Sequence, residues 1–395
     1  MTLTDAETRP LDGPSQEGRR SRRGLLLSAA AVLVAVGMIV AVVAMRGGGR
    51  SKVTTKLANT LDTAPPDTTS TTAASTSTTA AVTKPAAAAP AQQGGPCSMP
   101  TPGSSYPDAR FGAALAATPT GFVLYGGKGG DFADRTDAYR VECNGWAKAA
   151  ITHTPPALDG DSPVAVAYDP AIGQAVLVGG GATWAWNGSD WTSKGSAPQL
   201  SSAQLVYDAA HAQLVLVGNG DTMETWTWDG AAWTKRAANA PSGRSSFALV
   251  YDAARARTYL FGGASEGGGS VPTDLWSWDG TSWAKASPAH TPPSGPMTAA
   301  FDAAHNVTIA LAFAPNGAAE TWQWDGTDWT KLSTAHTPPR RLFGSMAFIP
   351  VVQRVVLFGG KVNTVTQQPG QIPTGDEQIV NDLWVWSGTD WTQLR

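Results

Sequence analysis

The chain contains five histidines, the side chain that most often serves as an acid, a base or a metal ligand near neutral pH. They are His153, His290 and His336, each in an HTPP string, and His211 and His305, each after YDAA or FDAA. Strings that recur along a chain are expected at equivalent positions that lie far apart, whereas a metal centre needs its ligands within a few ångströms of each other. We therefore predict no catalytic histidine, no metal site and no cofactor.

Carboxylates gather in one short segment, DFADRTD, which runs from Asp131 to Asp137. Calcium takes carboxylate oxygens as ligands, so a calcium site is one interpretation of this segment, and a solvated loop is the one we favour. A second string, SWDGTSW from Ser277 to Trp283, is similar to the S-x-D-x-G-x-T-W box of sialidases but lacks the residue between Asp and Gly. No pair of carboxylates typical of a glycosidase is evident, so glycoside hydrolysis is not predicted.

An arginine and an aspartate occur together at matching places in three segments of the chain. Three similar segments have no arginine at that place, and they have no aspartate either. The pairs are Arg110 with Asp137, Arg244 with Asp274, and Arg341 with Asp382. Two of the other segments carry glutamates, Glu224 and Glu320. Because a guanidinium fork matches a carboxylate, we predict three structural ion pairs.

The elements that position these residues repeat along the chain. The string W-x-W-(D/N/S)-G-x-x-W begins at Trp184, Trp226, Trp276, Trp322 and Trp384, and a degenerate sixth copy, YRVECNGW, begins at Tyr139. Most copies are separated by the roughly 40–50 residues of one propeller blade. These copies account for all 16 tryptophans, which we expect to pack between sheets rather than to form a binding surface.

Each unit predicts four strands, as the fourth unit shows with SSFALVYD, RTYLFGG, DLWSWDG and TSWAKAS. Asp-Gly between the third and fourth strands predicts a type I′ hairpin turn, which needs positive φ at both central residues. The aspartate that ends the first strand can accept N–H bonds from the turn that follows it. Small residues in the first strand suit the innermost position, where blades crowd around an axis.

Four units carry a Gly-Gly after the second strand, then an aromatic residue in the third strand and a tryptophan in the fourth. The glycine pairs are Gly126-Gly127, Gly179-Gly180, Gly262-Gly263 and Gly359-Gly360. This pattern resembles the kelch-repeat family over roughly three quarters of the chain. The resemblance implies an all-β fold, a six-bladed β-propeller of four-stranded antiparallel blades, whose usual role is to bind protein or carbohydrate. Units three and five lack the Gly-Gly, so we expect a distorted corner between their second and third strands.

Connections between the second and third strands are long in units one, four and six, over Lys128 to Thr136, Ala264 to Thr273, and Lys361 to Asn381. Because a propeller closes into a ring, the loops of units one and six should rise side by side, with the HTPP connections on the opposite face. The longest loop is open to two interpretations, polar recognition and a mobile insertion. The candidate ligand-binding residues are Lys128, Asp131, Asp134, Lys361, Asn363, Gln367, Gln368, Gln371, Asp376 and Glu377.

The N-terminal quarter of the chain differs in composition from the repeats. Residues 1–23 form a tail that ends in Arg19, Arg20, Arg22 and Arg23, and residues 24–45 are apolar and uncharged. About 20 apolar residues span a bilayer, and flanking basic residues stay in the cytoplasm. We predict one transmembrane helix at 24–45, a disordered Thr/Ser/Ala/Pro-rich linker at 46–96 and an exported propeller at 97–395. A cleaved signal peptide is the alternative, and it leads to the same export.

The chain has two cysteines, Cys97 and Cys143, without the CxxC spacing of a zinc site. Thiols are oxidised outside the cytoplasm. We therefore predict a disulfide that fastens the start of the propeller to its first blade.

The net charge is only -3 and the basic residues of the repeats are scattered, so nucleic acid is not an expected partner. We expect a membrane-anchored, extracytoplasmic module that binds or scaffolds a protein or a glycan. The alternative is a cell-envelope hydrolase or oxidase with its site in the central depression of the propeller.

Protease added to intact cells should degrade the propeller while the protein stays with the membrane fraction, because the arginine cluster before residues 24–45 retains the N-terminus inside. Immunoblotting of shaved cells and of the medium measures both properties. Protection of the propeller while an exported control protein is cut, or its quantitative recovery in the medium, would contradict the anchor.

Overall fold

The computed structural model describes Met99 and residues 105–142, 145–156, 165–220, 222–236, 240–265, 272–314, 317–363 and 377–395. All regular elements in these ranges are β-strands. No helix within the described ranges is long and apolar enough to cross a membrane. The predicted membrane helix at 24–45, the linker at 46–96 and both cysteines, Cys97 and Cys143, lie outside the described residues.

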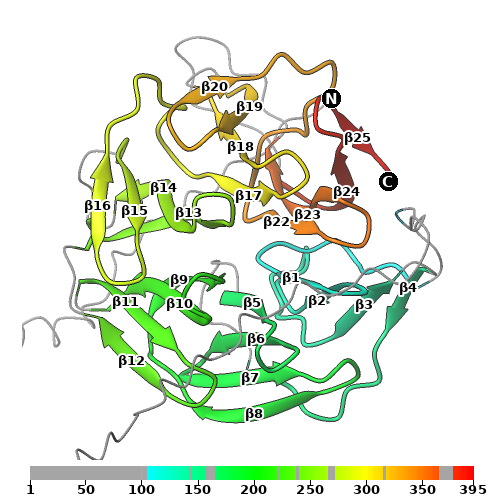
Figure 1. Ribbon diagram of the computed structural model, residues 1–395. Helices are drawn as coiled ribbons and strands as arrows, with labels where there is room; N and C mark the ends of the chain where they lie inside the picture. Colours follow the sequence, from blue (N-terminus) through cyan, green and yellow to red (C-terminus); the bar gives the residue numbers. More distant parts are fainter. Residues whose placement is uncertain are drawn as a thin grey trace, which may run out of the picture. The chain divides into compact units, whose positions relative to one another are not determined.

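Six antiparallel sheets stand in a ring around a central axis, and each sheet is one blade of consecutive strands (Figure 1). Blade 1 consists of β1 (Ala114–Thr118), β2 (Gly121–Tyr125), β3 (Ala138–Glu142) and β4 (Gly145–Lys148). Blade 2 consists of β5 (Ala165–Asp169), β6 (Gln174–Gly179), β7 (Ala182–Trp186) and β8 (Trp191–Ser196). Blade 3 consists of β9 (Ser201–Asp208), β10 (Gln213–Asn219), β11 (Met223–Trp228) and β12 (Trp233–Arg236).

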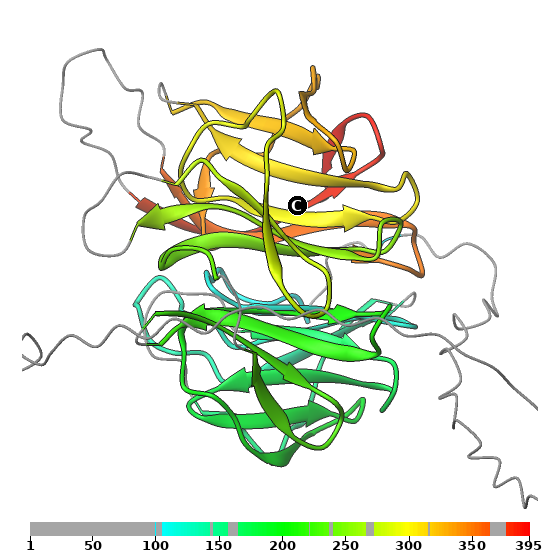
Figure 2. The same ribbon diagram turned by 60° about the vertical axis from the view of Figure 1, so that its left-hand side comes forward.

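The second half of the ring continues the same order (Figure 2). Blade 4 consists of β13 (Arg244–Asp252), β14 (Arg257–Ser265), β15 (Leu275–Trp278) and β16 (Trp283–Ala286). Blade 5 consists of β17 (Thr298–Asp302), β18 (Val307–Phe313), β19 (Ala319–Trp324) and β20 (Trp329–Lys331). Blade 6 consists of β21 (Arg341–Leu342), β22 (Ser345–Ile349), β23 (Arg354–Asn363), β24 (Glu377–Trp386) and β25 (Trp391–Gln393).

The predicted six-bladed, four-stranded architecture is confirmed. In blade 6 the two short strands β21 and β22 both pair with β23, and together they form one innermost strand that is interrupted at Phe343 and Gly344. We name the four positions a to d from the axis outwards. The end of the ring where strands b lead into strands c is called the b–c face, and the end with the a-to-b turns is called the a–b face.

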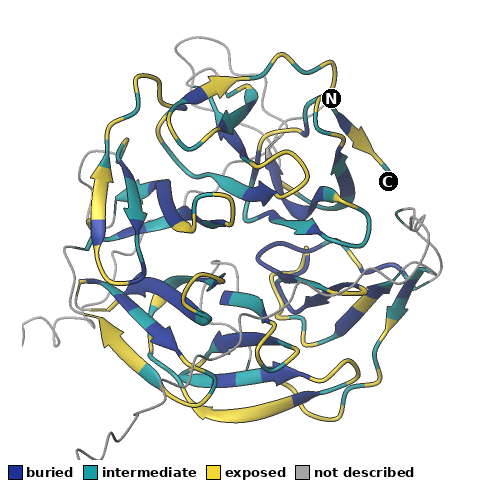
Figure 3. Cartoon of the chain, viewed as in Figure 1, coloured by how far each residue is buried: buried dark blue, intermediate teal, exposed yellow. Residues whose placement is uncertain are grey.

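Burial decreases from the axis to the rim. Successive a strands contact each other around the axis, and β22 closes the ring against β1. Figure 3 shows dark blue stretches on the inner strands and yellow stretches on outer strands such as β8, where only Trp191 is buried. Five tryptophans are among the largest fully buried side chains, Trp191, Trp278, Trp324, Trp386 and Trp391. The expected packing role of the tryptophans is confirmed at these positions.

The c-to-d turns are tight, but they are not the predicted type I′ turns. In blade 4, Trp278 pairs with Trp283, so four residues form the connection, and of these only Gly280 has a positive φ, 96°. The Asp279 carboxylate accepts the backbone N–H groups of Thr281 and Ser282 at 2.9 and 2.8 Å. The aspartate therefore acts as a side-chain cap of a longer turn, and glycine is needed at one position rather than two.

The a-to-b turns are capped as expected. The aspartate at the end of strand a, for example Asp252, is buried and accepts the backbone N–H groups two and three residues later. Strands b and c pair regularly up to the corner in blade 3 and in the described residues of blade 5, so the expected distortion of that corner is not seen. In blade 3 the register shifts instead between strands a and b, at Val217 and Asn219.

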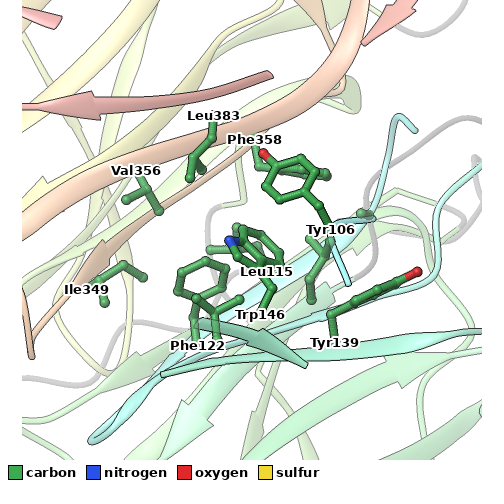
Figure 4. Close-up of a cluster of buried hydrophobic side chains, with 12 residues drawn as sticks. Tyr106, Leu115, Phe122, Tyr139, Trp146, Ile349, Val356, Phe358 and Leu383 are labelled. Atoms are coloured by element: carbon green, nitrogen blue, oxygen red, sulfur yellow. The ribbon is translucent and has the colours of Figure 1, made fainter. Parts of the chain in front are cut away.

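The ring is closed by the segment that precedes β1. The Tyr106 hydroxyl donates to the Asn381 carbonyl at 2.9 Å, and the Arg110 N–H donates to the Val380 carbonyl at 3.1 Å. Beneath this segment, side chains of blades 1 and 6 form one apolar cluster around Trp146 and Phe358 (Figure 4). Side-chain packing and a hydrogen-bonded lead-in therefore join the last blade to the first without an exchanged strand.

The three arginine–aspartate pairs have one common geometry. The guanidinium of Arg244 donates to the Asp274 carboxylate at 2.8 Å, to the Gly262 carbonyl at 3.3 Å and to the Ser242 carbonyl at 3.1 Å. Arg110 and Arg341 contact the same three kinds of partner: an aspartate carboxylate, the carbonyl of the first glycine of Gly-Gly and the carbonyl two residues before the arginine. All three arginine side chains have an exposed fraction of 0%. Burial alone would raise the pKa of Asp137 and Asp274, but hydrogen bonds from the guanidinium groups reverse this effect, lower both pKa values and hold that of Asp137 at about 2.

The Gly-Gly belongs to the same unit. A Cβ on the second glycine would lie 2.7 Å from the Ser245 carbonyl oxygen in blade 4 and 2.9 Å from the Leu342 carbonyl oxygen in blade 6. The first glycine, whose carbonyl accepts a bond from the arginine, lies at the start of the long b–c connection, and the aspartate lies at its end. One buried arginine therefore holds both ends of each long b–c connection.

Asp274→Ala should destabilise the ring by about 3–5 kcal/mol, because it leaves the buried charge of Arg244 without a partner. Glu320→Ala is a matched control. Asp274 and Glu320 each accept the indole N–H of the tryptophan two residues later, but the cation paired with Glu320 is Lys331, whose side chain is 55% exposed. The control substitution should lower the free energy of unfolding by only about 0–1 kcal/mol. Urea denaturation measures both values, and equal losses would show that the buried charge is not the determinant.

Candidate functional site

The long loops of blades 1 and 6 meet at the b–c face. Lys128 forms an isolated bridge with Phe111, which lies in the lead-in to blade 1. The Lys361 ammonium from blade 6 lies 4.0 Å from the centre of the Phe111 ring and 5.0 Å from that of Phe132 in the loop of blade 1. The two loops therefore start side by side on one face.

Lys361 lies among three aromatic rings, since its ammonium is also 5.5 Å from the centre of Phe343. The side chain is only 7% exposed. The rings of Phe111 and Phe343 are 6.0 Å apart, and both flank the start of an a strand. A cation held by three aromatic faces adds electrostatic attraction to the packing. Lys361 therefore contributes to the junction of the two loops rather than to their accessible surface.

Phe132 is the one large apolar side chain among the described residues that lies mostly in solvent, with an exposed fraction of 55%. Its backbone has a φ of 58°, in the left-handed region that bulky residues rarely occupy. The Phe132 N–H donates to the Gly129 carbonyl at 2.9 Å, and its ring leans against Phe111 with the centroids 5.9 Å apart. Sequence reasoning missed this residue, although it is the single large apolar residue in a loop of charged and small ones.

The three carboxylates of the predicted calcium alternative do not converge. Asp131 pairs with Arg135 at 3.0 Å, Asp134 with Lys128 at 2.7 Å, and Asp137 with Arg110. The Ala133 N–H and Arg135 lower the pKa of Asp131. Within the described ranges, no three His, Cys, Asp or Glu side chains are grouped as metal ligands. The loop is thus braced by ion pairs, and Lys128, Asp131 and Asp134 are among the residues that brace it.

The remaining candidate residues belong to the long loop of blade 6. Glu377 begins β24, pairs with Asn363 on β23 and is exposed. Gln367, Gln368, Gln371 and Asp376 lie outside the described residues. In blade 4, residues 266–271 of the equivalent loop also lie outside them. The described part of the site is therefore the junction of the loop bases, with Phe132 at its surface.

A second concave feature lies on the axis. The a strands enclose a cavity of about 480 Å³, and all six blades contribute residues to its wall. Among the described residues that line it, there is no Asp, Glu or His, and the one charged side chain is Arg341, which is already paired with Asp382. The described part of the wall therefore offers hydroxyl and amide groups rather than carboxylates or imidazoles.

The HTPP histidines connect neighbouring blades at the rim. Nδ1 of His290 donates to the Asp328 carboxylate at 2.6 Å, and its backbone N–H donates to the other oxygen at 2.8 Å. His153 and His336 make the same two contacts with the next blade, through Asp190 and Asp390. Hydrogen bonds from His290, first from its ring, hold the pKa of Asp328 at about 2. We call these three contacts the rim latches.

The expected position of the HTPP connections on the opposite face holds for the histidines, which contact c-to-d turns at the same end of the ring as the a-to-b turns, but it is wrong for the residues that follow them. The Tyr125 hydroxyl at the end of β2 donates to the Pro155 carbonyl at 2.8 Å. Thr291 and Pro292 likewise border a small pocket together with Pro272 and Thr273 of the b–c connection of blade 4. Each connection starts at the rim and then passes the b–c face, because it must reach the beginning of the next a strand.

The other two histidines have a local partner. Nδ1 of His211 donates to Asp208 at 2.7 Å, and His305 contacts Asp302 at the same distance. Arg255 takes the equivalent position in blade 4 and contacts Asp252. All five histidines are therefore paired with an aspartate at a structural turn.

Asp328→Ala should increase amide hydrogen exchange several-fold in the segment around His290, because both bonds of that rim latch are removed. Ser282→Ala is the control, since Ser282 holds the equivalent position in blade 4 and faces no HTPP histidine. In the unchanged protein the protection should persist at about pH 4, because the low pKa keeps Asp328 ionised there. Mass spectrometry of exchanged peptides measures the effect, and equal exchange in both variants would contradict the latch.

Comparison with protein-family models finds no match for this chain, and comparison with the curated proteins finds none either. The geometry therefore carries the assignment by itself. It gives a six-bladed β-propeller of four-stranded antiparallel blades, a fold that suits a binding or scaffolding module.

Proposed function

We propose that the chain is a membrane-anchored, kelch-type propeller that presents its b–c face outside the cytoplasm and binds a partner protein where blades 1 and 6 meet. The observation that carries this proposal is Phe132, a 55% exposed aromatic side chain on a strained backbone between two ion-paired loop ends. A bulky residue at positive φ costs of order 1–3 kcal/mol and persists where the surroundings impose it, often at binding sites.

The surroundings of Phe132 fit an anchor residue. Its ring rests on Phe111 and near the Lys361 ammonium, so one side of it is held while the other faces solvent. A rigid aromatic side chain contributes a large apolar area at little cost in conformational entropy. The neighbouring charges of Lys128 and Asp131 are already paired. A partner with an apolar pocket suits this surface better than a strongly charged polymer, and we therefore favour a protein over a glycan.

The kelch type is supported by the recurring Gly-Gly and by the aromatic positions of strands c and d. In blades 1, 4 and 6 the Gly-Gly has a physical task, because it supplies the carbonyl that the buried arginine contacts. Export and anchoring are supported by the arginine cluster and the apolar residues 24–45. In the described part of the chain no observation favours the hydrolase or oxidase alternative, so only the binding function is proposed.

Phe132→Gly should weaken partner binding by about 30-fold, the effect of losing an anchor of about 2 kcal/mol. Glycine adopts positive φ without strain, so the variant should stay folded, with a stability within about 1 kcal/mol of the unchanged protein. The full chain is extracted from its membrane in detergent, captured through a tag, and the co-purified material is quantified.

The matched control is Arg140→Ala, which changes an exposed residue of the same blade on β3. The partner should be retained by the unchanged chain and by this control, and lost with Phe132→Gly. Equal capture by all three forms would place the binding surface elsewhere. Captured material that is removed by glycosidases and survives protease would replace the protein partner with a glycan.

A further inference from the structure

The axial cavity is distinct from the loop surface around Phe132, because the a strands themselves form its wall. Equivalent residues of the six a strands, counted back from the end of each strand at the a–b face, border the cavity and define successive layers along the axis. A volume of about 480 Å³ is in the range of sites for small organic molecules. The composition of the layers decides which molecule fits.

The layer next to the a–b face is an aromatic collar with one gap. Five blades contribute a ring and blade 1 contributes a methyl group. The collar residues are Tyr168, Tyr207, Tyr251, Phe301, Phe348 and Ala117. Ala117 lies between Phe348 and Tyr168 in the order of the blades, so the collar is open on that side. The gap is a feature of the inner wall and does not require any loop to move.

The two layers beneath the collar are entirely aliphatic. The first consists of Ala116, Ala167, Val206, Val250, Ala300 and Ala347, and the second of Leu115, Val166, Leu205, Leu249, Ala299 and Met346. Several of these side chains, including Val166, Val206 and Met346, remain partly exposed although they are on the innermost strands. Their accessible surface faces the cavity. Water in an apolar space finds few hydrogen-bond partners, so an apolar ligand would bind there more favourably.

The collar also limits the charge of a ligand. Each of four collar residues is followed by a buried aspartate, the set being Asp169, Asp208, Asp252 and Asp302. The Arg255 guanidinium pairs with Asp252, and the imidazole rings of His211 and His305 contact Asp208 and Asp302. Asp169 and Asp208 contribute to the raised pKa of the collar residues Tyr168 and Tyr207, so their charges reach the collar and would repel an anion there.

The collar offers polar contacts that are still available. The hydroxyls of Tyr168 and Tyr207 make no hydrogen bond to any described residue, whereas Tyr251 accepts the Ala210 N–H at 2.9 Å. Burial raises the pKa of Tyr168 and Tyr207, so their hydroxyls stay protonated and can donate. Beyond the aliphatic layers, Gln204, Thr298 and Ser345 form a polar layer, in which Thr298 and Ser345 donate to the next blade. The apolar depth, three residues along a strand, is roughly 10 Å.

We propose that the axial cavity is a binding site for a small apolar molecule without negative charge, which enters from the a–b face through the gap at Ala117. Its apolar body fills the two aliphatic layers, and its rings or chain contact the aromatic collar. A hydroxyl, carbonyl or amine at its outer end hydrogen-bonds to Tyr168 or Tyr207. This site is independent of the partner surface at Phe132, and each can exist without the other.

A matched pair of probes tests both the polarity and the charge. N-phenyl-1-naphthylamine is neutral, and 8-anilino-1-naphthalenesulfonate has the same ring skeleton with a sulfonate added. The full chain is placed in lipid nanodiscs, and probe emission sensitised by the 16 tryptophans separates probe in the ring from probe in the lipid. The neutral probe should bind saturably at one site per chain. The anionic probe should bind at least about tenfold more weakly.

Substitutions then locate the site. Ala117→Phe installs the ring that Phe348 and Phe301 supply in blades 6 and 5, and it should close the gap and weaken neutral-probe binding by at least about tenfold. Ala167→Leu fills part of the first aliphatic layer and should have the same effect through lost volume. Ala284→Phe and Ala284→Leu are the matched controls on the exposed outer strand β16 and should bind as the unchanged chain does. Circular dichroism verifies that each variant is folded.

Each remaining outcome has a defined meaning. No saturable binding of the neutral probe overturns the proposal. Equal affinity for both probes overturns the charge requirement and with it the proposed ligand class. Unchanged binding in Ala117→Phe and in Ala167→Leu shows that the probe binds outside the axis. If Ala117→Phe does not fold, Ala167→Leu alone decides between these outcomes.

Discussion

The burial of three guanidinium groups is the constraint on which the b–c face of this propeller depends. A charge removed from water has to be fully hydrogen-bonded, and each arginine meets this need with a carboxylate, the carbonyl of the first glycine of Gly-Gly and a carbonyl two residues earlier. The glycine precedes a long loop and the aspartate follows it, so the ends of the loop are fixed irrespective of its length. This explains why the arginine, the Gly-Gly, the aspartate and a long connection all occur together in blades 1, 4 and 6.

The other three blades meet the same packing problem by different chemistry. In blades 2, 3 and 5 strand c carries a threonine where blades 1, 4 and 6 carry alanine or leucine. The hydroxyl of Thr225 accepts the indole N–H of Trp283 from the next blade at 2.8 Å, and Thr183 and Thr321 accept those of Trp233 and Trp391. In blades with a short b–c connection, strand c thus contacts the tryptophan of the next blade through a hydrogen bond. In blades with a long connection, the residue at that place of strand c is apolar. The ring consists of two kinds of blade that share one backbone plan.

The features that recur among the units could be predicted from the sequence, whereas the contacts between one unit and the next could not. Blade number, strand order and the arginine–aspartate partners follow from patterns within one unit, such as the shared positions of Arg244 and Asp274. The rim latches cross from unit to unit. Their signal is that each HTPP precedes a unit with aspartate before the last tryptophan, as with His153 and Asp190. The φ of Phe132 has no sequence signal, because it is imposed by how the loop closes on Gly129 and Phe111.

Departures from the repeat gather in blade 1, and the way in which the ring closes gives a reason. Every blade except the first receives its a strand from the connection of the blade before it, whereas blade 1 begins with a free lead-in that hydrogen-bonds to blade 6 through Tyr106 and Arg110. Those bonds hold the junction together with the apolar cluster around Trp146, against which Ala117 packs as a partly buried residue. Because the lead-in and this cluster already join the two blades, Ala117 can be small on one face and Phe132 can be strained and exposed on the other. The two proposed binding surfaces therefore both lie at residues of blade 1 that depart from the repeat, next to the junction where the ring closes.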